Sequence, residues 1–317
     1  MSPLFARQSP QDAPQAAPAD HRDRSHPRRT PPESGSISID VEDWYHILDS
    51  PAAPPLEQWD GLPSRLDANL NRLLELLDRH SVKATLFWLG WLAERNPALV
   101  RRSAAAGHEI ACHGFGHVLA YQVGRRAFTE DARRGKAVLE EITGQSVTGF
   151  RTAGFSTTDD TPWTFAQIKA AGYVYDSSVF PASRGHGGMA GAEVRPHVIH
   201  TAAGDLLELP QSVITILNRR VSFFGGGYLR LAPRPLIRWG IDRLRRAGQP
   251  LIVYVHPREI DPGHPRLPLS PLRRFKCYVN LASTMPKLQW LLADYRFITL
   301  RELAEQFWPS DARRTAA

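Results

Sequence analysis

The sequence predicts an α/β fold built on a parallel sheet, and three observations support this. Short apolar runs alternate with amphipathic segments of helical spacing from about residue 36 to residue 176, which is typical of successive βα units. Several predicted strands end in polar side chains, and ligands of α/β sheets bind at the carboxyl ends of strands. The chain has 317 residues, 42% of them hydrophobic, enough for one large α/β domain or two smaller ones. Such a sheet is either open or closed into a barrel.

The first predicted strand, residues 37–41, leads directly into a cluster of carboxylates. Its β-branched residues alternate with other side chains, which is typical of a buried strand. Asp40, Glu42 and Asp43 then fall within four residues, so we expect them at the carboxyl end of the strand. Carboxylates this close repel each other unless one is protonated or a cation neutralises them. The alternative interpretation of this segment is a solvated acidic loop.

The remaining elements follow from apolar periodicity. Apolar residues at helical spacing predict helices over about 64–80, 91–106, 128–142, 162–171, 236–247, 285–294 and 300–307. Apolar or β-branched runs predict strands over 84–89, 109–112, 147–151, 173–176, 206–210 and 251–255. Pro97 is expected to lie within the second helix or to divide it in two. We expect a loop over 185–200 and a Gly-rich turn over 224–228.

Composition and charge narrow the class of protein. The net charge is +7 with a pI near 9.7, but no Lys/Arg stripe with interleaved aromatics is present, so nucleic acid is not the expected partner. Attraction to an anionic polymer or a membrane surface stays open. Cys112 and Cys277 are too few for a disulfide scaffold and are expected to be reduced packing residues. With no apolar leader and no apolar run of about 18 residues, we expect a cytoplasmic protein, with a membrane-peripheral place as an option.

Two histidines follow the predicted strand at 109–112. His113 and His117 have the spacing of two ligands on one helical turn, and glycines beside them allow close approach of a ligand. Neutral imidazoles suit Zn²⁺ and similar ions. The spacing alone is a weak signal, but one carboxylate from the acidic strand would complete a site with open positions for water and substrate.

Arg151 and His256 also stand at the ends of predicted strands. The guanidinium could keep a catalytic carboxylate ionised and oriented, and the imidazole could protonate a leaving group. Taken singly, Arg151 suits a surface salt bridge and His256 suits a structural hydrogen bond. Taken with the carboxylates and the histidine pair, they predict a hydrolytic metal site.

At this point the sequence resembles NodB-homology polysaccharide deacetylases, carbohydrate esterase family four. It is most similar to the subgroup found with exosortase-type exopolysaccharide loci. The segments that carry the resemblance include Ser-Ile-Asp-Val-Glu-Asp-Trp and Gly-His-Glu-Ile-Ala-Cys-His-Gly-Phe-Gly-His. In chain order they are residues 38–44, 84–91, 107–117, 150–156, 175–181, 224–231, 254–261 and 278–281. Together they span about residues 36–308.

The resemblance implies a distorted (β/α) barrel with a C-terminal extension packed on it. The whole deacetylase domain would span residues 36–308. Its NodB-homology core would occupy about 36–182, and the subgroup extension 183–308, including the last barrel strand at 251–256. Residues 1–35 are rich in Pro, Ala and Arg and lack an apolar stripe, so they are expected to be a disordered tail. Residues 309–317 are expected to be a frayed tail.

The resemblance also implies the reaction and the roles of residues. One divalent metal ion, usually zinc, would support removal of N-acetyl groups from amino sugars of a polysaccharide, here in exopolysaccharide biosynthesis. The substrate would be an N-acetylated polysaccharide or oligosaccharide, and the protein would sit at the periphery of a synthesis complex. His113 and His117 would be metal ligands, Arg151 would orient the base, and His256 would be the general acid. Asp176 would shape the wall of the substrate groove.

The first motif departs from the family, which has two adjacent aspartates, base and then ligand. Aligning Glu42 and Asp43 on that pair makes Glu42 the base and Asp43 the ligand. Aligning Asp40 as the base makes Glu42 or Asp43 the ligand. Period two along a strand puts Asp40 and Glu42 on one face. As a working assignment, Asp40 and Glu42 are catalytic and Asp43 binds the metal, with the alternatives open.

Two other functions stay open beside the deacetylase. One is an amidase of the same fold that acts on small amides. The other is a glycan-binding module without catalysis. Aromatic residues near the motifs, among them Trp44 and Phe155, favour a sugar groove, and we assign both to substrate binding.

Overall fold

The computed structural model describes residues 34–48, 50–184 and 187–308. The tails expected at 1–35 and 309–317 therefore lie outside the described residues, except for Ser34 and Gly35. None of the helices in the described residues is both long enough and apolar enough to cross a lipid bilayer. Cys112 and Cys277 are free thiols, as expected.

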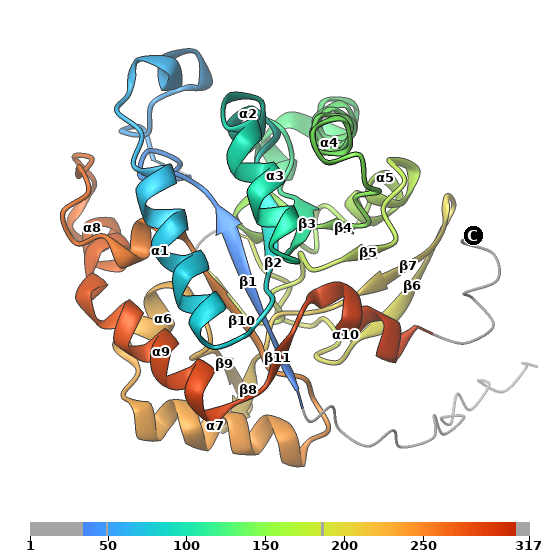
Figure 1. The fold of residues 1–317 in the computed structure, drawn as a ribbon. Coiled ribbons are helices and arrows are strands. Elements are labelled where there is room, and N and C mark those ends of the chain that lie inside the picture. Colours follow the sequence, from blue (N-terminus) through green and yellow to red (C-terminus); the bar gives the residue numbers. More distant parts are fainter. Residues whose placement is uncertain (1–33, 49, 185–186, 309–317) are drawn as a thin grey trace, which may run out of the picture. The chain divides into compact units, whose positions relative to one another are not determined.

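A nine-stranded, mostly parallel sheet forms the centre of the fold (Figure 1). The strand order is β10-β1-β2-β3-β4-β5-β7-β6, with β11 also pairing with β1, and only β6 and β7 pair antiparallel. No pairing closes the two ends of this order within the described residues, so the sheet is a curled, open half-barrel. The predicted α/β fold on a parallel sheet is thus confirmed. The strands are β1 (Gly35–Val41), β2 (Thr85–Trp88), β3 (Glu109–Cys112), β4 (Gly149–Phe150), β5 (Tyr175–Asp176), β6 (His197–Thr201), β7 (Gly204–Glu208), β10 (Ile252–Val255) and β11 (Phe297–Ile298).

Helices connect the strands, as the apolar periodicity predicts. They are α1 (Leu66–Arg79), α2 (Gly90–Arg95), α3 (Pro97–Ala105), α4 (Ala120–Thr143), α5 (Thr164–Ala170), α6 (Gly226–Leu231), α7 (Arg234–Arg246), α8 (Pro271–Tyr278), α9 (Thr284–Asp294) and α10 (Leu300–Phe307). Short 3₁₀ turns lie at η1 (Leu56–Gly61), η2 (Ala153–Phe155), η3 (Pro257–Ile260) and η4 (Leu281–Ser283). Pro97 divides the second predicted helix in two, because its first-turn position is the one that tolerates a missing N–H.

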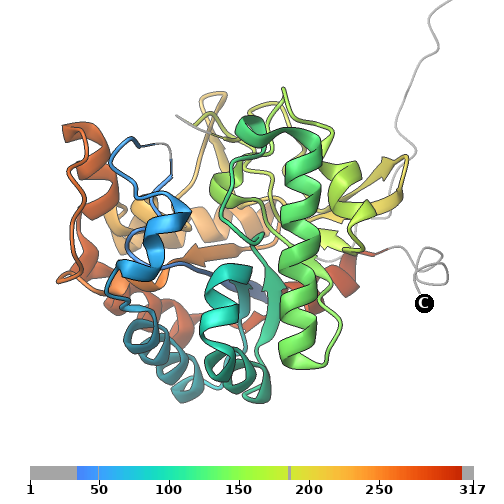
Figure 2. The same cartoon turned by 90° about the horizontal axis from the view of Figure 1, so that it is seen from above.

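Alternating side chains of the strands supply two hydrophobic cores. One face of the sheet packs against helices α1, α3, α4 and α7, and the long α4 runs beside β3 when the molecule is seen from above (Figure 2). The other face lies inside the half-barrel and packs against α10. Its buried strand residues are Phe87, Ala111, Tyr175, Leu207 and Ile252. With α10 covering one end of the interior, the carboxyl ends of the strands are left for the functional groups.

Strand register brings the polar strand ends to one edge of the sheet. All seven residues of β1 are buried, and β1 pairs with β2, β10 and β11. The register of β1 and β10 places Asp40 and His256 next to each other on adjacent strands. The register of β3 and β4 does the same for His113 and Arg151. Residues that lie far apart in the sequence therefore meet because parallel strands align their carboxyl ends.

The prediction of a Gly-rich turn at 224–228 is wrong, because helix α6 begins within this segment, at Gly226. A Cβ atom at Gly225 would lie 2.1 Å from the ring of Tyr254, and Gly226 has a φ of +51°, a conformation that favours glycine. The glycines are needed for the close packing of α6 against β10, next to the strand end that carries His256.

Several short elements were not predicted. The segment expected to be a loop at 185–200 contains the start of β6, and a hairpin of β8 (Ile214–Ile216) and β9 (Arg219–Val221) follows it. Three-residue strands are too short to show a period-two pattern. Helix α8 has Leu272 and Phe275 66% and 52% exposed, so it lacks the buried apolar stripe that would reveal a helix.

Candidate active site

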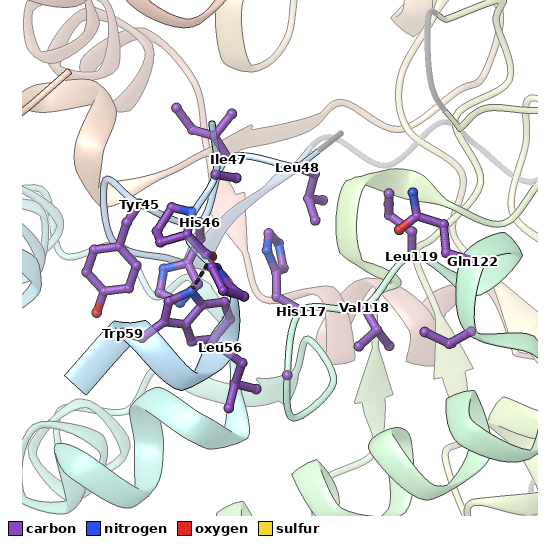
Figure 3. Close-up of a pocket in the computed structure, with 15 residues that line it drawn as sticks. Tyr45, His46, Ile47, Leu48, Leu56, Trp59, His117, Val118, Leu119 and Gln122 are labelled. Atoms are coloured by element: carbon purple, nitrogen blue, oxygen red, sulfur yellow. Dashed lines mark hydrogen bonds between the residues drawn. The ribbon is translucent and has the colours of Figure 1, made fainter. Parts of the chain in front are cut away.

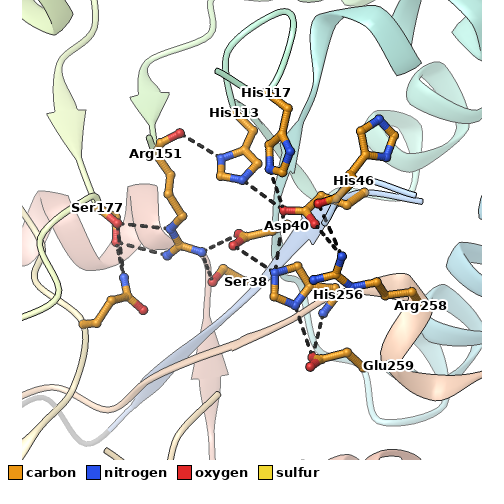
Figure 4. A network of polar contacts seen from close by, with 12 residues as sticks. Ser38, Asp40, His46, His113, His117, Arg151, Ser177, His256, Arg258 and Glu259 are labelled. Atoms are coloured by element: carbon orange, nitrogen blue, oxygen red, sulfur yellow. Dashed lines mark hydrogen bonds and ion pairs between the residues drawn. The ribbon is translucent and has the colours of Figure 1, made fainter. Parts of the chain in front are cut away.

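Predicted site residues converge at the carboxyl edge of the sheet, where Figure 4 shows Asp40, His113, His117, Arg151 and His256. Asp40 lies in β1 and Glu42 directly follows it, His113 follows β3, Arg151 follows β4, and His256 follows β10. The side chains of Asp40, Glu42, His113 and Arg151 are buried. The His256 side chain is 13% exposed. The edge therefore forms one site from four strands, as the sequence predicts.

Glu42, His113 and His117 form a cluster suited to a metal ion. The Glu42 Oε1 atom lies 2.9 Å from His117 Nε2 and 3.4 Å from His113 Nε2. One ligand atom from each residue lies within 4.8 Å of the others. Burial raises the pKa of Glu42, but His117, His256 and Arg258 outweigh it and hold that pKa well below its ordinary value.

The hydrogen bonds around the cluster leave lone pairs directed inward. His113 Nδ1 donates to the carbonyl oxygen of Arg151 at 2.8 Å, which leaves Nε2 as the ring's lone-pair atom. That Nε2 atom and Glu42 Oε2 are buried, and within the described part of the chain they have no hydrogen-bond partner. Metal-binding histidines are commonly held by such a carbonyl on the other nitrogen. The donor set, two imidazoles and one carboxylate, is one that suits Zn²⁺, so the residues fit the metal that the resemblance implies.

Asp43 is not part of the cluster that Glu42 forms with His113 and His117. Its carboxylate accepts hydrogen bonds from the Ser64 hydroxyl at 2.6 Å, the Arg65 N–H at 3.0 Å and the Trp44 N–H at 2.7 Å. These partners place Asp43 at the beginning of helix α1. The chain turns immediately after β1, and this turn directs Glu42 inward and Asp43 toward α1. The structure therefore places Glu42 where our working assignment put Asp43.

The two histidines lie on a loop rather than on the helical turn that their spacing suggested. Gly114 and His117 have φ angles of +81° and +55°, and these left-handed residues bend the loop back toward Glu42. The carboxylate of Asp131 on α4 accepts from the N–H groups of Phe115 at 2.8 Å and Gly116 at 2.7 Å. We did not predict this role for Asp131, because an aspartate within a predicted helix is not distinguishable from a solvent-facing one.

Asp40 is held by a buried guanidinium. Arg151 Nη1 donates to Asp40 Oδ1 at 2.6 Å and to the Ser38 hydroxyl at 2.8 Å. Arg151 Nε and Nη2 donate to the carbonyl and hydroxyl oxygens of Ser177, each at 3.1 Å. Both ionic side chains are buried, so loss of either would leave an unpaired buried charge at a cost of about 3–5 kcal/mol. This geometry allows Arg151 to orient Asp40.

His256 lies between the two carboxylates. Its Nε2 is 3.8 Å from Asp40 Oδ2 and 3.7 Å from Glu42 Oε1, and its Nδ1 is 3.2 Å from Glu259 Oε2. Burial lowers the pKa of His256, but Glu42 and Glu259 outweigh burial and raise that pKa above its ordinary value. A protonated imidazole at this place can donate to a leaving group.

Arg258 and Glu259 are functional neighbours that we did not predict. Arg258 Nη1 lies 3.4 Å from Glu42 Oε2. Glu259 contacts both His256 and Arg230, and its pKa, which burial raises and these two cations lower, falls to about 2. Both lie directly after His256 in the segment 254–261, so the signal was present in the sequence as charged residues on a strand end.

Of the three predicted substrate-binding residues, only Phe155 faces a cavity. A groove of about 610 Å³ is lined by Phe155 together with Asp40, Glu42 and His256. Trp44 is 6% exposed, its indole N–H donates to the Pro63 carbonyl at 2.9 Å, and it does not line the groove. Asp176 is fully buried and does not line it either. A second pocket, of about 240 Å³, extends from His117 past the residues shown in Figure 3, including His46 and Trp59.

Asp176 instead forms a carboxyl pair with Glu208 on the neighbouring strand. Burial raises the pKa of Asp176 to about 6. Burial and the negative charge of Asp176 raise the pKa of Glu208 well above its ordinary value. One oxygen of each carboxyl group is buried and has no other partner in residues 34–48, 50–184 and 187–308, which fits one proton shared between them.

Replacing Glu208 by glutamine is expected to reduce a pH-dependent loss of stability. Because both pKa values are raised, folding takes up protons above pH 4, and the free energy of unfolding falls as pH rises from about 4 toward neutrality. In Glu208→Gln this fall is smaller. For each proton that folding no longer takes up, the free energy of unfolding of the variant rises relative to the wild type by about 1.4 kcal/mol per pH unit. Denaturant unfolding at pH 5, 6 and 7 measures the difference, with the exposed Glu75→Gln as control. A difference that does not change with pH would contradict the shared proton.

Two family models match the chain. The model described as Polysaccharide deacetylase matches residues 58–175. A domain of unknown function (DUF3473) matches residues 177–305. Arg151 lies in the first match and His256 in the second, so the site is built from both.

Three curated relatives are similar to parts of the chain. A peptidoglycan-N-acetylglucosamine deacetylase of Bacillus cereus is 31% identical over 102 residues, which are 32% of this chain and 46% of that protein. A peptidoglycan-N-acetylglucosamine deacetylase of Listeria monocytogenes is 36% identical over 70 residues, 22% of this chain and 15% of that protein. A chitooligosaccharide deacetylase of Sinorhizobium fredii is 43% identical over 54 residues, 17% of this chain and 25% of that protein. The chain therefore spans less than half the length of each relative.

Solved structures share the fold. A probable polysaccharide deacetylase from Pseudomonas aeruginosa PAO1 has a TM-score of 0.55 at 20% identity, over 85% of this chain and 89% of that one. PuuE allantoinase has a TM-score of 0.55 at 18% identity, over 91% of this chain and 94% of that one. Residues 58–175 are thus similar to polysaccharide deacetylases by the family model and the curated relatives, and the solved structures share the fold.

Proposed function

We propose that this protein is a metal-dependent hydrolase that removes N-acetyl groups from amino sugars of a polysaccharide. The observation that carries the proposal is the cluster of Glu42, His113 and His117 beside the Asp40–Arg151 pair, with Glu42, His117 and Asp40 lining a groove. These three residues would hold one divalent ion, which we expect to be zinc because of the two imidazoles. Glu42 thus takes the ligand role that we first gave to Asp43.

The chain's own residues can perform the proton transfers of amide hydrolysis. The chemistry that a bound ion supplies at such a site is polarisation of the amide carbonyl. Asp40, oriented by its hydrogen bond from Arg151, accepts a proton from the attacking water. His256 donates a proton to the departing amine nitrogen, which makes it a leaving group. Its place between Asp40 and Glu42 brings the acid close to the base.

The domain organisation and the biological setting belong to the same proposal. We assign residues 36–182 to a NodB-homology core and residues 183–308 to an extension that also supplies β10 and His256. The match of residues 177–305 to a separate family model supports a division near this point. A role in exopolysaccharide biosynthesis, at the periphery of a synthesis complex, rests on the resemblance of segments such as 224–231 to the exosortase-associated subgroup.

Metal content and acetate release of purified protein test the proposal. We expect about one zinc-like ion per chain and release of acetate from N-acetylglucosamine oligomers. His113→Ala should lose both, whereas His200→Ala, which changes a histidine whose side chain is 81% exposed, should keep both. A wild-type protein that contains no metal and takes up no added Zn²⁺, Co²⁺ or Ni²⁺ would refute the metal-dependent mechanism. Small amides in the same assay separate the polymer deacetylase from an amidase.

A further inference from the structure

The groove beside the candidate active site is lined by more cations than carboxylates. Its carboxylates are Asp40, Glu42 and Glu259. Each has a guanidinium partner: Asp40 contacts Arg151, Glu42 contacts Arg258, and Glu259 contacts Arg230. The three carboxylates are therefore already paired with cations, and the groove is lined by other cations as well.

Two of these other cations are Arg184 and Lys276. Both line the groove. Across the described residues, no carboxylate oxygen lies within 4.0 Å of either charged group. Lys276 lies on helix α8, where it is exposed. These two cations make the groove attractive to an anion, because a concave surface concentrates the field of its charges.

The side chain of Arg184 is held in place while one of its donors stays unsatisfied. Its guanidinium carbon lies 4.5 Å from the ring centre of Phe180 and 4.9 Å from that of Phe155. Among the residues that the structure describes, its buried Nη1 atom has no hydrogen-bond partner. A guanidinium stacked on aromatic rings presents its N–H groups edge-on, which matches the two oxygens of a carboxylate.

The same groove offers rings for a sugar chain. Phe155, Tyr228 and Phe275 line it, and Tyr228 and Phe275 are 42% and 52% exposed. The rings and the two cations line the same cavity as Asp40 and His256. An extended ligand can therefore contact both the reacting groups and the cations.

We propose that the groove binds an acidic glycan, in which a hexuronic acid neighbours the N-acetylated sugar that is deacetylated. Arg184 binds the carboxylate of the uronic acid, and Lys276 adds attraction from the rim. This inference rests on the proposed deacetylase function and names its substrate class. It also assigns part of the chain's net charge of +7 to substrate binding.

A membrane is the other anionic partner that this surface could meet. Helix α8 carries Arg273, Arg274 and Lys276 together with the exposed Leu272 and Phe275, as a membrane-binding helix would. The observations favour the glycan, because Arg184, Asp40 and His256 line one cavity, which an extended sugar chain can enter and a flat bilayer surface cannot.

The first experiment compares two oligosaccharides of equal length with the metal-loaded protein. One contains only N-acetylglucosamine, and the other alternates N-acetylglucosamine with a hexuronic acid. We expect kcat/KM for acetate release to be about tenfold higher for the acidic oligosaccharide, as a hydrogen bond to a charged group would give. Added sodium chloride should reduce this preference, because salt screens the exposed charge of Lys276. Calorimetry gives the dissociation constants of both ligands independently of catalysis.

Variants then connect the preference to the groove. Arg184→Gln should lower the ratio of acidic to neutral kcat/KM about tenfold, and Lys276→Gln should lower it about threefold. Arg274→Gln is the matched control, since it removes an exposed cation from the same helix outside the groove lining, and the ratio should not change. Lys276→Gln keeps the test valid if Arg184→Gln is unstable, because Lys276 is exposed.

Each outcome decides between the inference and the function on which it rests. Acetate release without preference for the acidic oligosaccharide would refute the acidic glycan and leave the deacetylase standing. No acetate release, with tight binding of the acidic oligosaccharide that needs Arg184, would refute the deacetylase and support the groove. Equal losses of binding to anionic phospholipid vesicles in Arg274→Gln and Lys276→Gln, with no change in the glycan ratio, would replace the glycan by a membrane.

Discussion

Glu42→Gln is expected to abolish tight metal binding, whereas Asp43→Asn is expected to preserve it. Glu42 lies 2.9 Å and 3.4 Å from the two histidine nitrogens, and it supplies the only charge among the three ligands. Its replacement by a neutral amide should lower the affinity for Zn²⁺ by more than about 100-fold. Even residues that only hydrogen-bond to the metal ligands change the metal affinity by about 10- to 100-fold. Competition with a chromogenic zinc chelator measures the affinity, and acetate release should fall with it.

Asp43→Asn serves as the matched control for this prediction. The side chain of Asp43 accepts from Ser64 and Arg65 at the start of α1, so its loss should appear as about 1 kcal/mol of stability, like the loss of a helix cap. Denaturant unfolding measures that cost. The reverse result, in which Asp43→Asn loses the metal and Glu42→Gln keeps it, would show that the motif aligns with Glu42 as base and Asp43 as ligand.

Asp40→Asn is expected to lower kcat for acetate release by about 10²- to 10⁴-fold, the range of general base catalysis, while metal content is retained. The amide cannot accept the proton of the attacking water. The same change leaves Arg151 without its buried anion, so the free energy of unfolding should fall by about 3–5 kcal/mol. Stopped-time acetate assays and urea unfolding of the same preparation separate the two effects.

Ser38→Ala provides the comparison for Asp40→Asn. It removes the other acceptor of Arg151 Nη1, at 2.8 Å, and leaves the carboxylate in place. We expect only the loss of about 1 kcal/mol that a single hydrogen bond contributes. If Asp40→Asn stayed within tenfold of wild-type activity while Ser38→Ala did not, Arg151 and not Asp40 would be the group that the reaction needs.

Much of the fold could be predicted because its signals are local. Apolar periodicity over 64–80, 236–247 and 285–294 is written in consecutive residues, and the structure has helices there. The polar residues that follow each strand are also visible in consecutive residues. The half-barrel brings those at the ends of β1, β3, β4 and β10 together. The short elements escaped prediction for the same reason: a three-residue strand or a helix with exposed apolar residues has no periodic signal.

What the sequence by itself determined is the set of elements and the chemical types at their ends. Carboxylates, imidazoles and a guanidinium had to meet at one edge, because parallel strands present their carboxyl ends together. The tertiary structure alone decided which carboxylate faces the histidines. Glu42 and Asp43 are neighbours in the chain, and the turn after β1 directs one inward and the other toward α1. The tertiary structure alone also decided that Asp176 pairs with Glu208, and that Arg184 and Lys276 line the same groove. Such pairings depend on register and helix placement between distant segments, and no local pattern of residues encodes them.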